Sequence, residues 1–262
     1  MSLNLSAFVP NSPMLLPTVG KNNISLTAAT IEAYKKLARD LADKKIETII
    51  LVSPLGIIHD NCFTLNVEPI FNCNFEIFGD LSTKFEVAGD VELAHELKKA
   101  LDTKYSLQLS SINPLDYGSG VPMFFIKQTL PKVKIVPIYP ANDQLTNLFA
   151  FGQSLKHEIE ISSKKIAVIA SGSLSQCLSK LSPAGYSPKA RAWDKKIIKA
   201  IEQKQNRLIL EQDESIRQEV KEAGLNSLSA LLGCFDNIDH QTKLLSYEYP
   251  FGVGLLVFEF LV

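Results

Sequence analysis

The stretch of residues 46–60, IETIILVSPLGIIHD, constrains the fold of this chain more than any other. Six of the seven residues from 46 to 52 are β-branched or apolar, and the run ends at once in the loop sequence SPLG. This pattern predicts a buried strand that enters a tight loop. Ligands of open α/β sheets collect beyond the carboxyl ends of the strands. We therefore expect residues 53–60, with their single histidine His59, to meet whatever the protein binds.

Composition excludes several classes of protein. The 262 residues are 46% hydrophobic and 21% charged, as in an ordinary globular protein. The balance of 27 basic against 28 acidic residues gives no electrostatic reason to expect nucleic acid or an anionic membrane as a partner. No biased linker interrupts the chain, so we expect one domain over residues 1–262.

The N-terminus and the cysteines both bear on cellular location. The N-terminal segment lacks the features of a signal peptide, and no window reaches the roughly 18 apolar residues of a transmembrane helix. The four cysteines lack the CxxC spacing of a zinc or redox site and are expected to be reduced thiols: Cys62, Cys73, Cys177 and Cys234. Both observations favour a cytoplasmic protein.

Strand and helix patterns alternate along the chain. Residues 5–10, 24–44 and 46–52 predict a β-α-β unit whose right-handed crossover makes the two strands parallel. Further strands are predicted at 62–67, 75–87, 107–112, 134–139, 165–170, 243–247 and 254–260. Further helices are predicted at 90–101, 121–128, 143–161 and 226–232. Another helix is predicted directly after the small residues 171–173, and a charged, solvent-facing helical region is predicted at 187–216. The last strand is almost wholly apolar, which indicates burial on both faces. The fold class is a single-domain α/β sandwich with a central mixed, largely parallel sheet flanked by helices.

Four loops fall at strand ends and are expected to converge: 11–13, 55–60, 171–176 and 247–254. Among their residues only His59, Asp60 and Glu248 are strong metal ligands. A stable site for a first-row metal usually needs about three or four such groups at one point.

Six segments in order carry a family resemblance: VPNSPMLLPTVG, LVSPLG, DYGSGVP, IASGSLSQ, SPAGYSP and LSYEYPFGVG. They resemble the class III extradiol ring-cleavage dioxygenase family, including its Memo-like relatives, over residues 9–257. The resemblance implies an α/β sandwich and Fe(II) held by two histidines and one carboxylate, with open positions for a catecholate and dioxygen. A further histidine acts as acid and base during the opening of the aromatic diol ring.

The family's histidine positions hold other residues in this chain. Asn11 and Leu55 stand at the two ligand positions, while Tyr117 and Gln176 stand at two further histidine positions. Ser173 replaces an acidic residue of the family, and only the carboxylate survives, as Glu248. Because leucine cannot coordinate a cation, the usual iron site should not assemble. The resemblance therefore implies either Fe(II) in an altered site or no cofactor.

Two interpretations remain open for these residues. In the first, an enzyme uses Gln176 and Tyr117 as catalytic residues, while His59 and Glu248 hold a metal weakly. In the second, a metal-free pseudoenzyme binds a small aromatic molecule or a protein partner in the same cleft, with oligomers possible. In either case the substrate-binding residues are Asn11, Leu55 and Ser173. Glu248 also has a structural interpretation, in which it is an acid hydrogen-bonded to the backbone of the Gly252 turn. The corresponding interpretation of His59 is a solvated loop residue.

Overall fold

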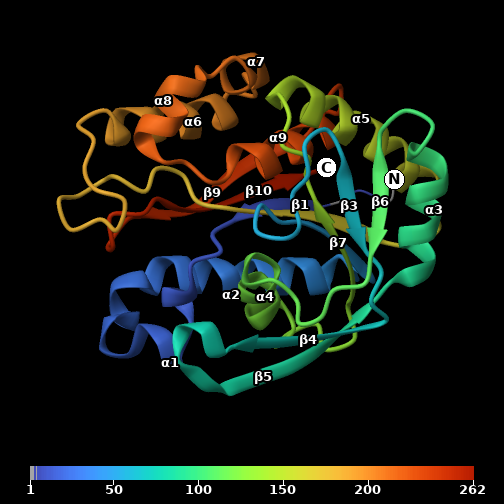
Figure 1. Cartoon of the computed structure of the whole chain (residues 1–262), viewed down its shortest axis with the longest axis horizontal. Coiled ribbons are helices and arrows are strands. Elements are labelled where there is room, and N and C mark those ends of the chain that lie inside the picture. The colour runs from blue at the N-terminus through green and yellow to red at the C-terminus, as the bar shows by residue number, and fades with distance from the viewer. Residues whose placement is uncertain (1–2, 4) are drawn as a thin grey trace.

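A ten-stranded sheet runs through the computed structural model, which describes residue 3 and residues 5–262 (Figure 1). The order along its main path is β4 (Ile70–Phe75), β5 (Asp80–Gly89), β7 (Lys134–Tyr139), β2 (Thr48–Val52), β8 (Ile166–Ser171), β1 (Leu5–Val9), β10 (Leu255–Leu261) and β9 (Gln241–Glu248). Off this path, β3 (Phe63–Asn66) pairs with β7 and with β6 (Leu107–Ser110). The mixed sheet confirms the predicted fold class.

The centre of the sheet is parallel. Strands β7, β2, β8 and β1 run in one direction, so β1 and β2 are parallel as predicted, with β8 between them. Strands β10 and β9 then add antiparallel to this edge. The loops after β1, β2, β7 and β8 therefore meet the turn between β9 and β10 at one edge, which we call the carboxyl edge. The opposite side is the amino edge.

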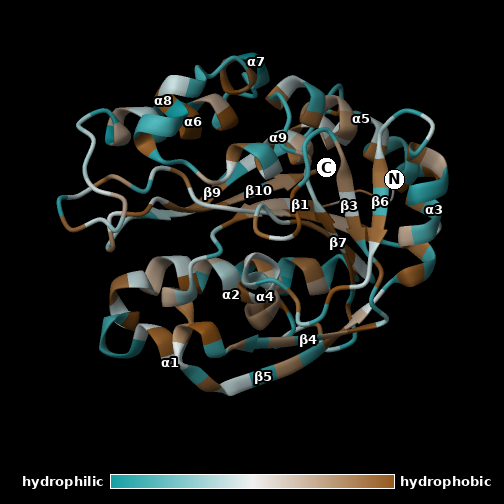
Figure 2. Cartoon of the chain, viewed as in Figure 1, coloured by the Kyte–Doolittle hydropathy of each residue, from teal (hydrophilic) through white to brown (hydrophobic). Residues whose placement is uncertain are grey.

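The two faces of the sheet carry separate hydrophobic cores. Successive residues of β2 alternate between them, with Ile50 and Val52 on one face and Ile49 and Leu51 on the other. Helices α3 (Val91–Leu101), α5 (Leu145–Ile161), α6 (Ala190–Glu202) and α9 (Leu225–Cys234) cover the first face. Helices α2 (Ala28–Asp43) and α4 (Tyr117–Ile126) cover the second (Figure 1). Hydrophobic residues accordingly concentrate on the sheet between these layers (Figure 2).

Several predicted boundaries were wrong near the N-terminus and the β4–β5 hairpin. Two short 3-10 segments, η1 (Pro13–Leu15) and η2 (Lys21–Thr27), and the single turn α1 (Pro17–Gly20) precede α2, so the long helix begins later than predicted. The predicted strand at 75–87 is interrupted by η3 (Glu76–Phe78), which ends at Gly79 with φ 78°. That left-handed residue turns the chain from β4 into β5, and β4 was missed.

Two helical predictions also need correction. No described helix begins directly after Ser171-Gly172-Ser173. Instead, residues 172–189 form a loop in which the Leu174 amide donates to the Gly254 carbonyl at 3.0 Å. The region 187–216 is not simply a solvated face, because α6 buries Trp193, Ile197 and even Asp194. It continues through α7 (Asn206–Leu210) and α8 (Glu214–Val220).

The final strand is confirmed as buried, with every residue of β10 except the last inaccessible or nearly so. Three of the four free cysteines are buried as well, and burial raises the pKa of Cys73 and Cys234 to about 12. No helix in the described part of the chain combines the length and apolar character needed to cross a bilayer.

Candidate functional site

The topology brings the ends of five elements to the carboxyl edge. Asn11 lies just beyond β1, Leu55 beyond β2 and Ser173 beyond β8. Glu248 is the last residue of β9 and pairs with Leu255 at the start of β10. Tyr117 is the first residue of α4. The four loops predicted to lie at strand ends thus belong to one edge, although their side chains form separate small clusters.

Gln176 and Ser173 form the first cluster. The Gln176 Nε2 donates to Ser173 Oγ at 3.2 Å, and the Gln176 amide donates to the Val220 carbonyl at 2.9 Å. Ser173 itself pairs with Ala223 in an isolated antiparallel bridge. These bonds attach the loop after β8 to the segment between α8 and α9. The side chains of Gln176 and Ser173 are hydrogen-bonded to each other, and neither is an acid or a base near neutral pH.

Leu55 lies against the start of α4. A Cβ atom on Gly118 would stand 3.1 Å from Leu55 Cδ1 and 2.4 Å from Ser53 Oγ, so only glycine permits this close approach. The adjacent Tyr117 is half-buried, and its ring meets Phe78 edge-on with centroids 4.9 Å apart. Burial, and then the neighbouring Asp116 carboxylate, raise the pKa of Tyr117. Its hydroxyl therefore stays protonated at neutral pH.

Asp116 is a polar centre that the sequence analysis missed. Its Oδ1 accepts from Ser53 Oγ at 2.6 Å and from the Ser119 amide at 3.0 Å, while Oδ2 accepts from Ser119 Oγ at 2.8 Å. It caps α4, which explains why the helix begins at Tyr117 rather than at residue 121. Burial, and then Asp116, also raise the pKa of Tyr139 at the end of β7. The sequence signal for this helix cap was an aspartate, Asp116, at the position just before the small residues that open α4.

A second missed carboxyl, Asp194 of α6, is fully buried near the same edge. It accepts hydrogen bonds from the Ser175 amide at 3.0 Å, from Ser175 Oγ, and from the Tyr247 hydroxyl at 2.6 Å. Burial raises its pKa, and the hydrogen bonds from Ser175 and Tyr247 offset only part of this effect. Asp194 thereby holds in place the two residues that precede Gln176 and Glu248.

Glu248 is occupied by a structural partner. Its Oε1 accepts from the backbone amide of Thr30 at 2.9 Å, in the first turn of α2. Thr27, the N-cap residue of that helix, makes no side-chain capping bond, so the carboxylate satisfies an amide that would otherwise lack a partner. The Gly252 turn is closed by its own backbone, with the Gly252 amide donating to the Tyr249 carbonyl at 3.0 Å. The structural role of Glu248 is thus a helix cap.

His59 and Glu248 are the two residues that the sequence analysis predicted as metal ligands. His59 is exposed in a loop, where its backbone forms an isolated antiparallel β-bridge with Cys62. The His59 carbonyl accepts from the Asn142 amide at 2.9 Å. Within residues 3 and 5–262, no three side chains of the types His, Cys, Asp and Glu converge in a way that would hold a metal. Neither His59 nor Glu248 therefore belongs to such a group in the described part of the chain.

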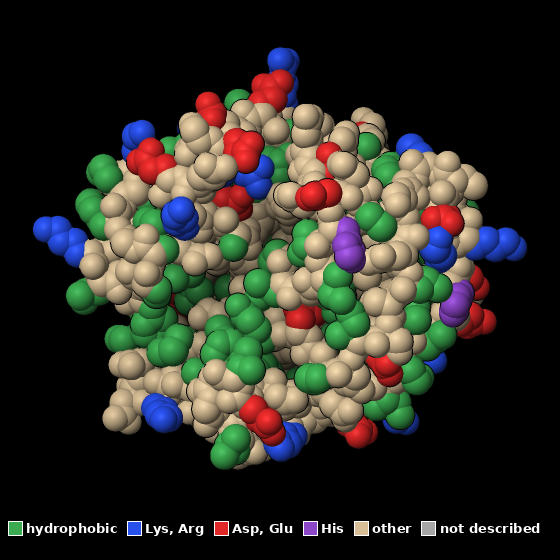
Figure 3. All heavy atoms as spheres, in the orientation of Figure 1, with side chains coloured by type: hydrophobic (Ala, Val, Ile, Leu, Met, Phe, Trp, Pro, Cys, Tyr) green, Lys and Arg blue, Asp and Glu red, His purple; other side chains and the backbone are tan. Residues whose placement is uncertain are grey.

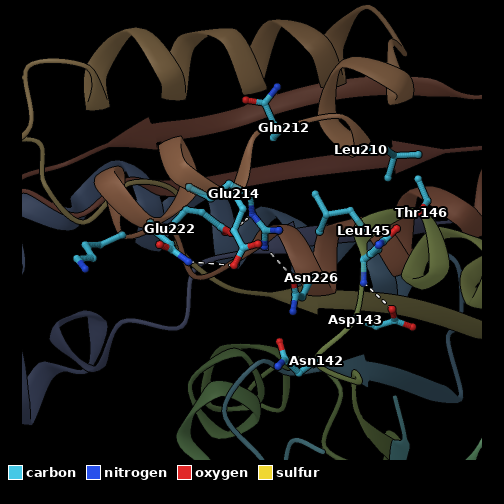
Figure 4. A pocket seen from close by; sticks show the side chains of 13 residues that line it. Asn142, Asp143, Leu145, Thr146, Leu210, Gln212, Glu214, Glu222 and Asn226 are labelled. Carbon is cyan, nitrogen blue, oxygen red and sulfur yellow. Dashed lines mark hydrogen bonds and ion pairs between the residues drawn. The ribbon is translucent and has the colours of Figure 1, made fainter. Parts of the chain in front are cut away.

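A cavity of about 840 Å³ opens at the carboxyl edge beside these clusters. It lies between the loop after β7 and the helices α7 to α9, where Asn142 and Asn226 stand on opposite sides (Figure 4). On the face shown in Figure 3 the surface is hollowed near its centre, with charged side chains of both signs above the hollow and hydrophobic ones below. None of the sequence-predicted site residues lines this cavity.

Two charged groups of that cavity, Arg217 and Glu222, are bound to each other. Arg217 Nε donates to Glu222 Oε1 at 2.7 Å, and its Nη2 donates to Asn226 Oδ1 at 2.9 Å. Glu222 Oε2 accepts from the amides of Gly224 and Leu225 at 2.9 and 2.8 Å, which caps α9. These bonds hold α8 against the start of α9.

Comparisons with known proteins agree with this architecture. The chain is 28% identical to Protein CA_C1420 of Clostridium acetobutylicum over 97% of its own length. It spans only 56% of that longer relative. The uncharacterized protein JW3007 from Escherichia coli K12, known from a crystal structure, superposes with a TM-score of 0.68 at 15% identity, covering 98% of this chain and 99% of that one. The likeness shows a shared fold.

A family model decides the wider relationship. Residues 5–258 match the model described as the catalytic LigB subunit of aromatic ring-opening dioxygenase. The match covers nearly every element of the sheet and both helical layers. The chain therefore belongs to the LigB family, and it is a class III extradiol dioxygenase-like protein.

Proposed function

We propose that this protein is a divergent member of its family that has lost iron-dependent ring opening and uses the carboxyl edge of the sheet, around Leu55 and Tyr117, as a binding site for a small aromatic molecule. The observation that carries the proposal is the hydrogen bond from the Thr30 amide to Glu248. The one carboxylate kept at a family ligand position is engaged by a helix terminus. Asn11 and Leu55, which stand at the other two ligand positions, offer no imidazole.

The same residues favour aromatic binding without a metal. Leu55 and the half-buried Tyr117 provide an apolar and aromatic wall next to the polar group of Asp116. Asn11 and Gln176 replace imidazoles with amides, which donate and accept hydrogen bonds but do not exchange protons near neutral pH. A hydroxylated ring would find stacking and hydrogen-bonding groups here, without a group that activates dioxygen.

Iron reconstitution tests the loss of activity. Protein loaded anaerobically with Fe(II) and desalted should retain far less than one iron per chain and should consume no oxygen with catechol. The Glu248→Gln variant should match the wild type in both measurements, because the carboxylate is not a ligand. About one iron per chain in the wild type, lost in Glu248→Gln and accompanied by oxygen uptake, would reject the proposal.

Metal-free titration tests the retained binding. Catechol should bind the metal-free protein, and Tyr117→Ala should weaken that binding about tenfold by removing the stacking surface. The conservative Tyr117→Phe change should cost less, since the ring remains. Equal affinities in the wild type and both variants would place the ligand elsewhere.

A protein partner is a second candidate, supported by the loop after β2. Leu55, Ile57 and Ile58 are 36%, 44% and 38% exposed within four residues, which is an unusual grouping of apolar side chains on one loop. If this loop binds another chain or a second copy, light scattering should detect association that Ile57→Ser with Ile58→Ser abolishes. A monomer at all concentrations would exclude self-association through this loop.

A further inference from the structure

A second cavity, of about 560 Å³, opens at the amino edge of the sheet. Its walls come from the end of α2, the start of β2, the segment between α4 and β7, and two residues from the loops flanking α3 and α5. The volume is within the usual range of about 300–1,000 Å³ for small-molecule sites. It lies at the opposite end of the strands from the family's site and is independent of the function proposed above.

The floor of this amino-edge cavity is apolar. Ile46, Leu130 and Val133 line it and are each more than nine-tenths buried. They belong to the hydrophobic core on the α2 side of the sheet, so the floor is fixed by packing. A ligand with an apolar body would cover surface that the fold already holds in place.

The acidic groups of the cavity are already neutralised or bonded. Asp90 is buried, accepts from Thr48 Oγ1 at 2.7 Å, and forms an ion pair with Lys164 Nζ at 2.9 Å. Glu47 Oε2 accepts from the Lys165 amide at 2.8 Å. Among the described residues, neither carboxylate forms an ion pair with the other lysines that line the cavity.

Three rim lysines, Lys45, Lys132 and Lys134, are exposed and line the cavity. In the described part of the chain, none of the three forms an ion pair with a carboxylate. With Lys164, the cavity carries four lysines against two acidic residues, a net charge of +2, on a chain whose net charge is −1. Gathered like charges without a counterion favour an anionic ligand.

We propose that the amino-edge cavity binds an amphipathic organic anion, with its apolar body on the floor formed by Ile46, Leu130 and Val133. The three rim lysines contact its carboxylate or phosphate group as point charges. The apolar floor distinguishes this ligand from a free inorganic anion, and the unpaired lysines distinguish it from a neutral hydrophobic molecule.

Calorimetric titration with matched probes tests the proposal on the full chain. We expect 2-naphthoate to bind at least tenfold more tightly than 2-naphthamide, and inorganic phosphate to bind far more weakly than either anionic naphthalene. 2-Naphthyl phosphate is the second anionic probe, and its affinity relative to 2-naphthoate identifies the preferred head group. Equal affinity for naphthoate and naphthamide, or no binding of any naphthalene at millimolar concentration, would overturn the proposal.

A matched pair of triple variants locates the site. K45Q with K132Q and K134Q should weaken naphthoate binding about tenfold, as expected for three partly screened charges. K195Q with K196Q and K199Q removes the same charge from exposed positions of α6 and should leave the affinity unchanged. Equal weakening in both variants would show non-specific attraction and would also overturn the assignment.

Discussion

The two cavities at opposite edges of the sheet use charge in different ways. At the carboxyl edge, Arg217 and Glu222 bind each other and the start of α9, so their charges hold neighbouring helices together. At the amino edge, Lys45, Lys132 and Lys134 line the cavity and form no ion pair with any carboxylate that the structure describes. A ligand that binds Arg217 or Glu222 at the first cavity must displace bonds within the chain, whereas a ligand that binds the three lysines at the second displaces no ion pair among the described residues. The cavity at the carboxyl edge has the larger volume of the two, so volume alone would have favoured it as the ligand site.

Removing the anchor of the amino-edge cavity should have the largest effect. Asp90→Ala leaves Lys164 and Thr48 without their buried acceptor and should lower the free energy of unfolding by about 3 kcal/mol. Glu92→Ala is the control, because Glu92 also pairs with Lys164, at 3.0 Å, but its side chain is 74% exposed. That change should cost about 0.5 kcal/mol or less. Urea denaturation measures both free energies of unfolding. Similar losses in the two variants would contradict the greater importance of the buried carboxylate of Asp90.

A buried carboxyl away from both edges should make stability depend on pH. Glu259 of β10 is buried beneath α2, with Lys36 Nζ 3.4 Å from its Oε2. Burial, followed by the nearby Asp40, raises the pKa of Glu259 to about 7, above its ordinary value of 4.5. The folded state therefore binds the proton more tightly than the unfolded state does.

The contribution of Glu259 to stability should be complete below about pH 4.5 and should be lost as the pH rises to about 7. The total change should be about 2 kcal/mol, because Lys36 and Asp40 share the interaction. In the Glu259→Gln variant, the urea midpoint of unfolding should depend less on pH across this range than it does in the wild type. An unchanged slope in that variant would assign the pH dependence to other groups.

Breaking the network of the carboxyl-edge cavity should cost somewhat less. Glu222→Ala removes the partner of Arg217 and the cap of α9, with an expected loss of about 1.5 kcal/mol. Glu211→Ala, which breaks the exposed pair with Arg207, serves as the control and should change stability by under about 0.5 kcal/mol. If both variants unfold at the same urea concentration, the charges of this cavity are not structural.

The smallest predicted effect concerns the inherited carboxylate. Glu248→Ala should cost about 1 kcal/mol by uncapping α2, and Glu248→Gln should cost less because its amide oxygen still accepts from Thr30. Fe(II) should not raise the melting temperature of the wild type. Stabilisation by iron that disappears in both variants would restore Glu248 to the role of a ligand.

Sequence patterns predicted what depends on local periodicity. The β-branched and apolar run of residues 46–52 and the apolar final strand identified β2 and β10, and the parallel crossover placed Asn11 and Leu55 at one edge. Partners distant in sequence were inaccessible to such reasoning. Glu248 caps a helix 218 residues earlier in the chain, so no local pattern announces it. Asp194 was hidden because the charges of its helix suggested exposure, although hydrogen bonds from Ser175 and Tyr247 allow its burial.

The cap on α2 also ties the carboxyl edge to the helical layer. Glu248 offers one oxygen to the Thr30 amide, so a change at this residue alters the start of α2 as well as the loops at the sheet edge. A redesign of this edge that replaces Glu248 would therefore need a substitute acceptor for the helix.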